Sequence, residues 1–262
     1  MTEQTHTAAA AGPILAAVQA DMGEVLVTID PAATVARVVI STKDAEGPSA
    51  DAVRRTRITQ DGNRLSITVP EVEGSNVGVS VYGSGNFIQN VTSVGRGQTM
   101  TGVTIVNGRV ISGGISGGSA VVSPIEVRVT LPAGSGVRMN GRNANLTVSG
   151  VLAALDYSGH NGHIRTGVVG RIKVRTHNGH TDADVVQEWA DIEGHNGDTE
   201  IGTYSGTAAR LITHNGSIRL AASPAASGQI EARSYNGNIR LHGTNRTGLD
   251  VQTSTRNGRV SK

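Results

Sequence analysis

The chain has 262 residues, a formal net charge of +2 and no cysteine. The absence of cysteine excludes disulfide bonds, thiolate zinc sites and cysteine nucleophiles. The near-neutral charge and the small number of aromatic residues argue against a nucleic-acid-binding face. The core must be built chiefly from Val, Ile, Leu and Ala, which suits a narrow tube of short strands.

Residues 1–22 contain an Ala-rich stretch without clear alternation, and we expect them to form a loosely ordered N-terminal arm. No Lys or Arg precedes Arg37, so the apolar residues lack the positive flank of a signal peptide. No apolar run approaches the length of a transmembrane segment. We therefore expect a cytoplasmic protein without a membrane span.

Residues 23–74 alternate between apolar and polar side chains, which predicts opening strands that begin or cap a stack. Strands are expected at 25–29, 35–40, 57–59 and 65–69, separated by turns such as Asp30-Pro31 and Asp61-Gly62. A stack needs a cap because its first strand otherwise exposes unpaired backbone groups.

Residues 75–123 form a Gly-rich insertion, with eleven Gly among 49 residues and no Asp or Glu. Alternation typical of strands persists from Val77 to Val81 and from Val103 to Ile111. Two interpretations stay open: a mobile or hairpin-like insertion lying on the solenoid, or a surface for self-association, because uncharged strand-forming segments readily pair with one another.

Residues 124–262 carry the most informative pattern in the chain. After an alternating strand, Ile125–Leu131, and the turn Pro132-Ala133-Gly134, an Asn-Gly pair recurs with spacings of 17 to 21 residues. Asn-Gly suits tight turns, and a turn that returns at a period near twenty is typical of stacked repeats. The pairs begin at Asn161, Asn178, Asn196, Asn215, Asn236 and Asn257, with a further pair at Asn140-Gly141. We predict an all-β, single-domain β-solenoid.

The opening strand Gly23–Val27, the Leu-Pro-x-Gly turn and the ladder of short strands with Asn-Gly turns resemble the bacterial putative-adhesin family of β-strand-repeat domains of unknown function. The likeness covers residues 22–74 and 123–262 and leaves the Gly-rich insertion outside. It implies a β-helix, and it transfers no catalytic residue because the shared motifs are structural.

Aligning the coils on Asn-Gly places equivalent residues one strand spacing apart, about 4.8 Å. Residues four and six before Asn and three after it are mostly apolar, so we expect them to point inward. The six stacked asparagines are expected to form a hydrogen-bonded ladder with a structural role. Five before Asn, the charge alternates from coil to coil, which indicates register rather than a binding patch. This last column contains Asp156, Lys173, Asp191, Arg210 and Glu231.

Six histidines gather around the same corner of four adjacent coils and are the candidate ligands for Zn²⁺, Ni²⁺ or Cu²⁺. They are His160, His163, His177, His180, His195 and His214. Side chains that repeat in register point the same way and do not converge, so stacking without a metal is the simpler interpretation. We expect no other cofactor.

No paired catalytic carboxylates and no phosphate-binding loop or hydrolase motif occur, so we do not expect an enzyme. The pattern indicates a non-enzymatic scaffold that associates with itself through the Gly-rich insertion or through an open C-terminal rung near Val260. Positive charge at that rung, from Arg256, Arg259 and Lys262, could instead discourage stacking. The alternative function is a metal- or glycan-binding module that uses the histidine corner.

Overall fold

The computed structural model describes residues 1–72, 99–106, 109–116 and 123–262, with the backbone path alone for the two short ranges. It is an all-β structure, a single β-solenoid of about six turns, as the Asn-Gly spacing predicts. The elements are β1 (Thr2–Ala11), β2 (Leu15–Ala20), β3 (Met22–Ile29), β4 (Val35–Thr42), α1 (Pro48–Arg54), β5 (Arg57–Asp61), β6 (Arg64–Val69), β7 (Thr99–Val106), β8 (Arg109–Ser116), β9 (Glu126–Leu131), β10 (Gly136–Asn161), β11 (Ile164–Asn178), β12 (Thr181–Asn196), β13 (Thr199–Tyr204), β14 (Ala208–Asn215), β15 (Ile218–Ala222), β16 (Gly228–Asn236), β17 (Ile239–His242), β18 (Leu249–Asn257) and β19 (Val260–Ser261).

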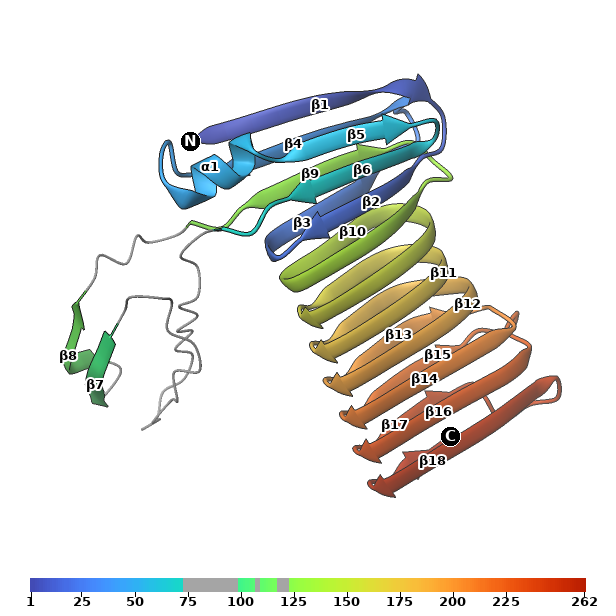
Figure 1. Cartoon of the computed structure of the whole chain (residues 1–262). Coiled ribbons are helices and arrows are strands. Elements are labelled where there is room, and N and C mark those ends of the chain that lie inside the picture. The colour runs from blue at the N-terminus through green and yellow to red at the C-terminus, as the bar shows by residue number, and fades with distance from the viewer. Residues whose placement is uncertain (73–98, 107–108, 117–122) are drawn as a thin grey trace.

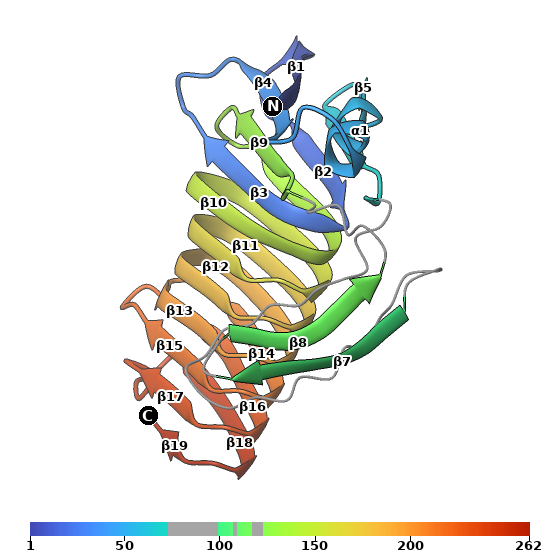
Figure 2. The ribbon, with the colours of Figure 1, turned by 90° about the vertical axis from the view of Figure 1, so that its left-hand side faces the viewer.

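Two walls of strands enclose the core (Figures 1 and 2). The first wall consists of the segments that run toward the repeated corner. In order they are β18, β16, β14, the later parts of β12, β11 and β10, the first part of β10, then β2 and β6. These segments pair in parallel, and β5 closes the wall by pairing antiparallel with β6. Each coil therefore contributes two strand segments, one to each wall.

The second wall contains the segments that follow each Asn-Gly turn: β19, β17, β15, β13, the first parts of β12 and β11, the middle of β10, then β3 and β9. Beyond β9 the direction changes twice, because β4 pairs antiparallel with β9 and β1 pairs antiparallel with β4. The strand β1 thus runs in the same direction as β9, β3 and β19.

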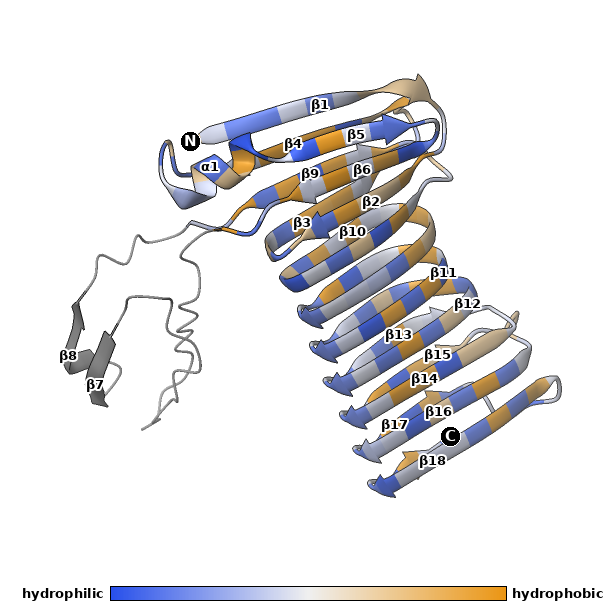
Figure 3. Cartoon of the chain, viewed as in Figure 1, coloured by the Kyte–Doolittle hydropathy of each residue, from blue (hydrophilic) through white to orange (hydrophobic). Residues whose placement is uncertain are grey.

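Side chains alternate between polar and apolar along the strands, as Figure 3 shows by hydropathy. The inward columns predicted from the repeat lie in the core: four before Asn, Tyr157, Val174, Ile192 and Leu211 are all 0% exposed. Burying an aliphatic side chain of this size stabilises the fold by about 1.5–3 kcal/mol. The expected inward direction of these columns is confirmed, and one continuous hydrophobic core results.

The prediction of a loose arm for residues 1–22 is wrong. The segment forms β1 and β2, and its small apolar side chains are buried at Ala8, Ala16 and Val18. Alanine has a weak preference for strands, so the sequence alone does not indicate this structure. Pairing with β4 and β6, which are distant in sequence, determines it.

The helix α1 was not expected from the sequence. It begins at Pro48, which is compatible with a first helical position, and it carries Asp51 in its first turn and Arg54 in its last. Its Ala52 and Val53 side chains are fully buried in the core cluster. The helix therefore helps to cover the core at the N-terminal end of the solenoid.

The Gly-rich insertion lies mostly outside the described residues. Its described parts, β7 and β8, pair antiparallel with each other and form a sheet separate from the solenoid. The two interpretations of this segment stay predictions. Across the described ranges, no helix has the length and apolar character needed to cross a membrane.

Candidate functional site

The six repeated asparagines stand in one column at the corner between the two walls. Each side-chain amide nitrogen donates to the amide oxygen of the asparagine in the preceding coil, at 2.6–2.8 Å between Nδ2 and Oδ1. The donors are Asn161, Asn178, Asn196, Asn215, Asn236 and Asn257. Strand pairing holds the same residues in register, so the side-chain bonds follow the backbone ladder.

The column has a first member that the dipeptide pattern does not reveal. Asn143 accepts from Asn161, whereas Asn140 of the earlier Asn-Gly pair lies beside Gln19 of β2. Asn143 is followed by Ala144 and not by Gly. The signal that finds it is its spacing of 18 residues from Asn161, which matches the coil length.

The glycines after Asn are needed because the coils approach closely at this corner. A Cβ on Gly197 would stand 2.0 Å from the carbonyl oxygen of Gly179, which no side chain can tolerate. Gly197 also has φ of 139°, in the region that favours glycine. Asn-Gly is therefore required by backbone packing as well as by the side-chain ladder.

The residues just before Asn form a column of stacked rings. His160, His177, His195, His214 and Tyr235 lie with centroids 4.6–4.8 Å apart and ring planes within 15° of parallel. Arg256 of the last coil lies over the ring of Tyr235, with its guanidinium carbon 5.1 Å from the centroid, and donates to the tyrosine hydroxyl. The stack is a ridge of ring edges that follows the solenoid axis.

The residues two after Asn form a second ladder, which joins side chains to backbone. At five of these positions the backbone N–H donates to a side-chain acceptor of the coil before it, at 2.7–3.3 Å. The acceptors are Asn145 Oδ1, His163 Nδ1, His180 Nδ1, Asp198 Oδ1 and Asn238 Oδ1. Sequence reasoning missed this role, because Asn, His and Asp share no simple pattern except the ability to accept.

These contacts weigh against a metal centre. His163 and His180 use the Nδ1 lone pair to accept a backbone N–H, so this nitrogen is not available to a metal ion. The rings of the other four histidines are parallel, so their nitrogens do not converge. In the part of the chain that the structure describes, no three His, Asp or Glu side chains are placed to hold a metal ion.

The charged column on the first wall pairs across coils. Asp191, with 14% of its side chain exposed, accepts from Arg175 at 2.6 Å and from Arg210 at 3.1 Å. Burial disfavours the ionised carboxylate, but the hydrogen bonds and charges of Arg175 and Arg210 outweigh burial and hold the pKa of Asp191 below its usual value. The column supports the register, and its members Asp156, Asp191, Arg210 and Glu231 each form an ion pair within the chain.

A shallow groove of about 440 Å³ runs beside the histidine ridge across four coils. His177, His195 and His214 form one side, Arg175 and Glu193 stand on the other, and small residues such as glycine lie between them. The groove therefore presents imidazole edges together with a guanidinium and a carboxylate that bind each other at 3.3 Å.

The last coil leaves backbone donors free. In the five coils before it, the N–H of the glycine after Asn and the N–H two residues further on donate to carbonyl oxygens of the next coil, at 2.9–3.1 Å. The equivalent groups of the last coil are the N–H of Gly258 and the N–H of Val260. Neither has an acceptor among the described residues, and the strands β18 and β19 pair on one side only.

The core is also open at this coil. Ile230 and Ala232 of β16 are fully buried, but the residues beneath them in β18, Val251 and Thr253, are half-buried. Val260 is 38% exposed, although its counterparts in earlier coils are buried. We call the surface formed by β18 and β19 the terminal rung. It combines unpaired strand backbone with the exposed end of a hydrophobic core.

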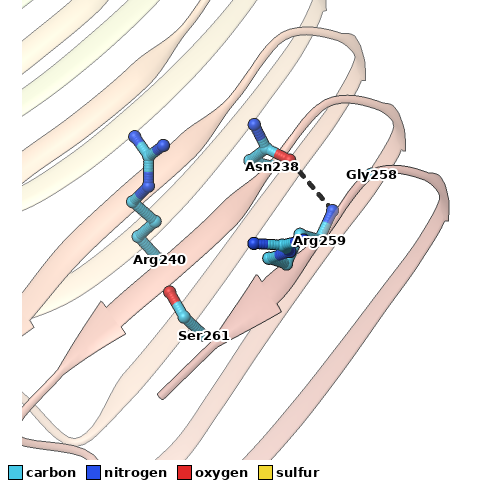
Figure 4. A pocket seen from close by; sticks show the side chains of 5 residues that line it. All are labelled: Asn238, Arg240, Gly258, Arg259 and Ser261. Carbon is cyan, nitrogen blue, oxygen red and sulfur yellow. Dashed lines mark hydrogen bonds between the residues drawn. The ribbon is translucent and has the colours of Figure 1, made fainter.

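A hollow of about 450 Å³ lies on the second wall at the terminal rung, lined by Asn238, Arg240, Gly258, Arg259 and Ser261 (Figure 4). The side-chain oxygen of Asn238 accepts the backbone N–H of Arg259 at 2.9 Å. The guanidinium groups of Arg240 and Arg259 form no ion pair with a described carboxylate. The hollow is therefore rich in hydrogen-bond donors.

No family model and no curated protein matches the chain. Three similar solved structures are a "putative cell adhesion protein" from Clostridium sporogenes (9% identity, TM-score 0.42, 99% of this chain and 97% of that one), a "putative adhesin" from Bacteroides fragilis (10%, 0.42, 99% and 96%) and a "putative lipid binding protein" from Parabacteroides distasonis (8%, 0.28, 100% and 97%). The first two carry the adhesin name that the sequence resemblance suggested. At these identities and TM-scores, the likeness carries no argument about function.

Proposed function

We propose that the chain is a non-enzymatic scaffold that associates with further copies of itself through the terminal rung. The observation that carries the proposal is the pair of unpaired N–H groups of Gly258 and Val260 beside a half-buried end of the core. Such a strand edge templates the addition of another strand, and natural proteins usually cover it. At the N-terminal end, α1 buries Ala52 and Val53 over the core, so the two ends are unlike.

The charges of the described residues support a binding rather than a catalytic role. Carboxylates on the walls, such as Asp191 and Glu200, form ion pairs with arginines of neighbouring coils. Acid–base catalysis needs carboxylates or imidazoles whose ionisation differs and that face a common substrate. Along the walls these carboxylates are instead bound to arginines within the chain.

Light scattering across a concentration series tests the proposal. We expect the mass to grow with concentration, and a mass fixed at 26.9 kDa would overturn it. Val260→Pro removes one outward N–H and should weaken association, while Val260→Thr keeps the N–H and should not. Loss of association on deleting residues 83–118, with no effect of Val260→Pro, would move the interface to the Gly-rich insertion. Reversal by a chelator would move it to the histidine column.

The groove beside the histidine ridge favours a second candidate function, binding of an extended glycan. Imidazoles repeat along it beside one guanidinium and one carboxylate, and these groups can donate to or accept from sugar hydroxyls. Saturation-transfer NMR with cellohexaose as the probe tests this candidate. His195→Ala should weaken the transfer, because it removes the imidazole at the middle of the groove. Absence of transfer to the unaltered protein would reject it for this glycan.

A further inference from the structure

Charges on the second wall pair off along the solenoid until the terminal rung. In the column four residues after Asn, Arg165 meets Asp182 at 3.6 Å, and Glu200 meets Arg219 at 3.2 Å. The next member, Arg240, lies opposite Ser261 of β19 and has no acidic neighbour in the column. One guanidinium is therefore left without a carboxylate at the end of the stack.

Arg259 adds a second uncompensated charge. Arg259 is the second residue after Asn, and in earlier coils this column holds a hydrogen-bond acceptor such as Asp198 or Asn238. In the last coil the long basic side chain of Arg259 instead lies beside Arg240 and Ser261 (Figure 4). Two guanidinium groups, a hydroxyl and the N–H of Gly258 are all donors. Such a set suits a carboxylate, because guanidinium and carboxylate form strong, charge-assisted hydrogen bonds.

The other positive charges of the last coil are already engaged. Arg256 contacts the ring and hydroxyl of Tyr235, and the ammonium of Lys262 donates to the carbonyl oxygen of Val251 at 3.1 Å. The charge available to a partner is thus concentrated at Arg240 and Arg259, on the second wall.

This charge opposes a two-fold contact that brings the second walls of two terminal rungs together. Such a contact would place the same arginines of both copies side by side, and like charges across an interface cost several kcal/mol. The surface that best complements the second wall of the terminal rung is therefore a different one, with an acidic group at this wall.

The strand β1 offers such a surface. It is the last strand of the second wall at the N-terminal end, and among the described residues it pairs only with β4. Glu3, which is exposed, is its one charged residue. Because β1 runs in the same direction as β19, placing it below β19 of another copy continues a parallel wall.

We infer that association is head to tail: β1 of a second copy adds to β19, and the carboxylate of its Glu3 accepts from Arg240 and Arg259. The inference rests on the self-association proposed above and specifies its polarity. A head-to-tail contact repeats without closing, so the product is a filament whose mass keeps growing with concentration.

A charge exchange tests the inference. Glu3→Arg alone and the double variant Arg240→Glu/Arg259→Glu alone should each associate at least about tenfold more weakly than the unaltered chain, because each places like charges at every joint. Mixing the two variants in equal amounts should restore filaments, since every joint between unlike copies is then complementary. Arg142→Glu/Arg171→Glu, which makes the same change of net charge as the double variant at two exposed ion pairs far from the joint, should associate normally.

The outcomes separate the two proposals. If Glu3→Arg still associates like the unaltered chain but Arg240→Glu/Arg259→Glu does not, the head-to-tail contact is wrong. The terminal rung would then bind another surface of the second copy. Association that persists in both variants, or no recovery on mixing, would overturn the inference and leave self-association standing. A monomeric mass of the unaltered chain at all concentrations would overturn both.

Discussion

Replacing Asn196 by alanine removes two hydrogen bonds from the middle of the asparagine ladder. Its Nδ2 donates to Asn178 at 2.7 Å, and its Oδ1 accepts from Asn215 at 2.8 Å. A side-chain hydrogen bond contributes about 0.5–1.5 kcal/mol net, and the partners left behind are partly accessible to water. We therefore expect a loss of about 1–3 kcal/mol in the free energy of unfolding.

Asn257 provides the matched control because it ends the ladder. It donates to Asn236 at 2.7 Å and, among the described residues, accepts nothing from a further asparagine. Its replacement by alanine should therefore cost about half as much as that of Asn196. Both variants can be measured by urea unfolding followed by circular dichroism, with the slope of the transition unchanged. Equal losses in the two variants, or a loss below about 0.3 kcal/mol for Asn196→Ala, would refute the reasoning.

Three further perturbations test other parts of the fold. His180→Ala should destabilise by about 1 kcal/mol, whereas His180→Asn keeps an acceptor for the N–H of Asp198 and should cost less in the same unfolding assay. Burial raises the pKa of Tyr157 and of Tyr204 to about 12, above the usual value near 10. Their contribution to stability is complete below pH ~10 and is lost as the pH rises toward about 12. Absorbance of tyrosinate should therefore rise together with loss of circular dichroism, and separate transitions would contradict this. The lowered pKa of Asp191 contributes stability above the pKa of an unfolded aspartate, near 3.9, and loses it as the pH falls through the folded value. Asp191→Asn should therefore lose less stability between pH 5 and pH 3 than the unaltered chain, and parallel losses would count against the ion pairs.

The spacing of Asn-Gly was enough to predict the solenoid and its inward columns. A side chain such as Ile192 is buried because strand periodicity and coil length together place it beneath Val174. In a repeat protein, contacts between coils can be predicted from the sequence, because residues one coil apart in sequence are neighbours in space. The expected charge column follows from the same register, with Asp191 opposite Arg210.

The sequence did not reveal features that depend on unrepeated contacts. The strand β1 is a strand because β4 binds it, and no local pattern in its Ala-rich end indicates this. The roles of His163 and His180 were hidden for a different reason: their clustering suggests ligands, but the backbone N–H that each accepts is visible only in space. Asn143 was not recognised as a member of the asparagine ladder because Ala144, and not glycine, follows it.

The position of β9 has a consequence for synthesis of the chain. It lies between β3 and β4 in the second wall, although the Gly-rich insertion separates it from both in sequence. During translation, β3 and β4 therefore cannot pair with β9 until Leu131 has left the ribosome. Once β9 has paired with β3 and β4, each later coil can fold onto the one before it as it emerges, so completion of this first template precedes growth of the stack.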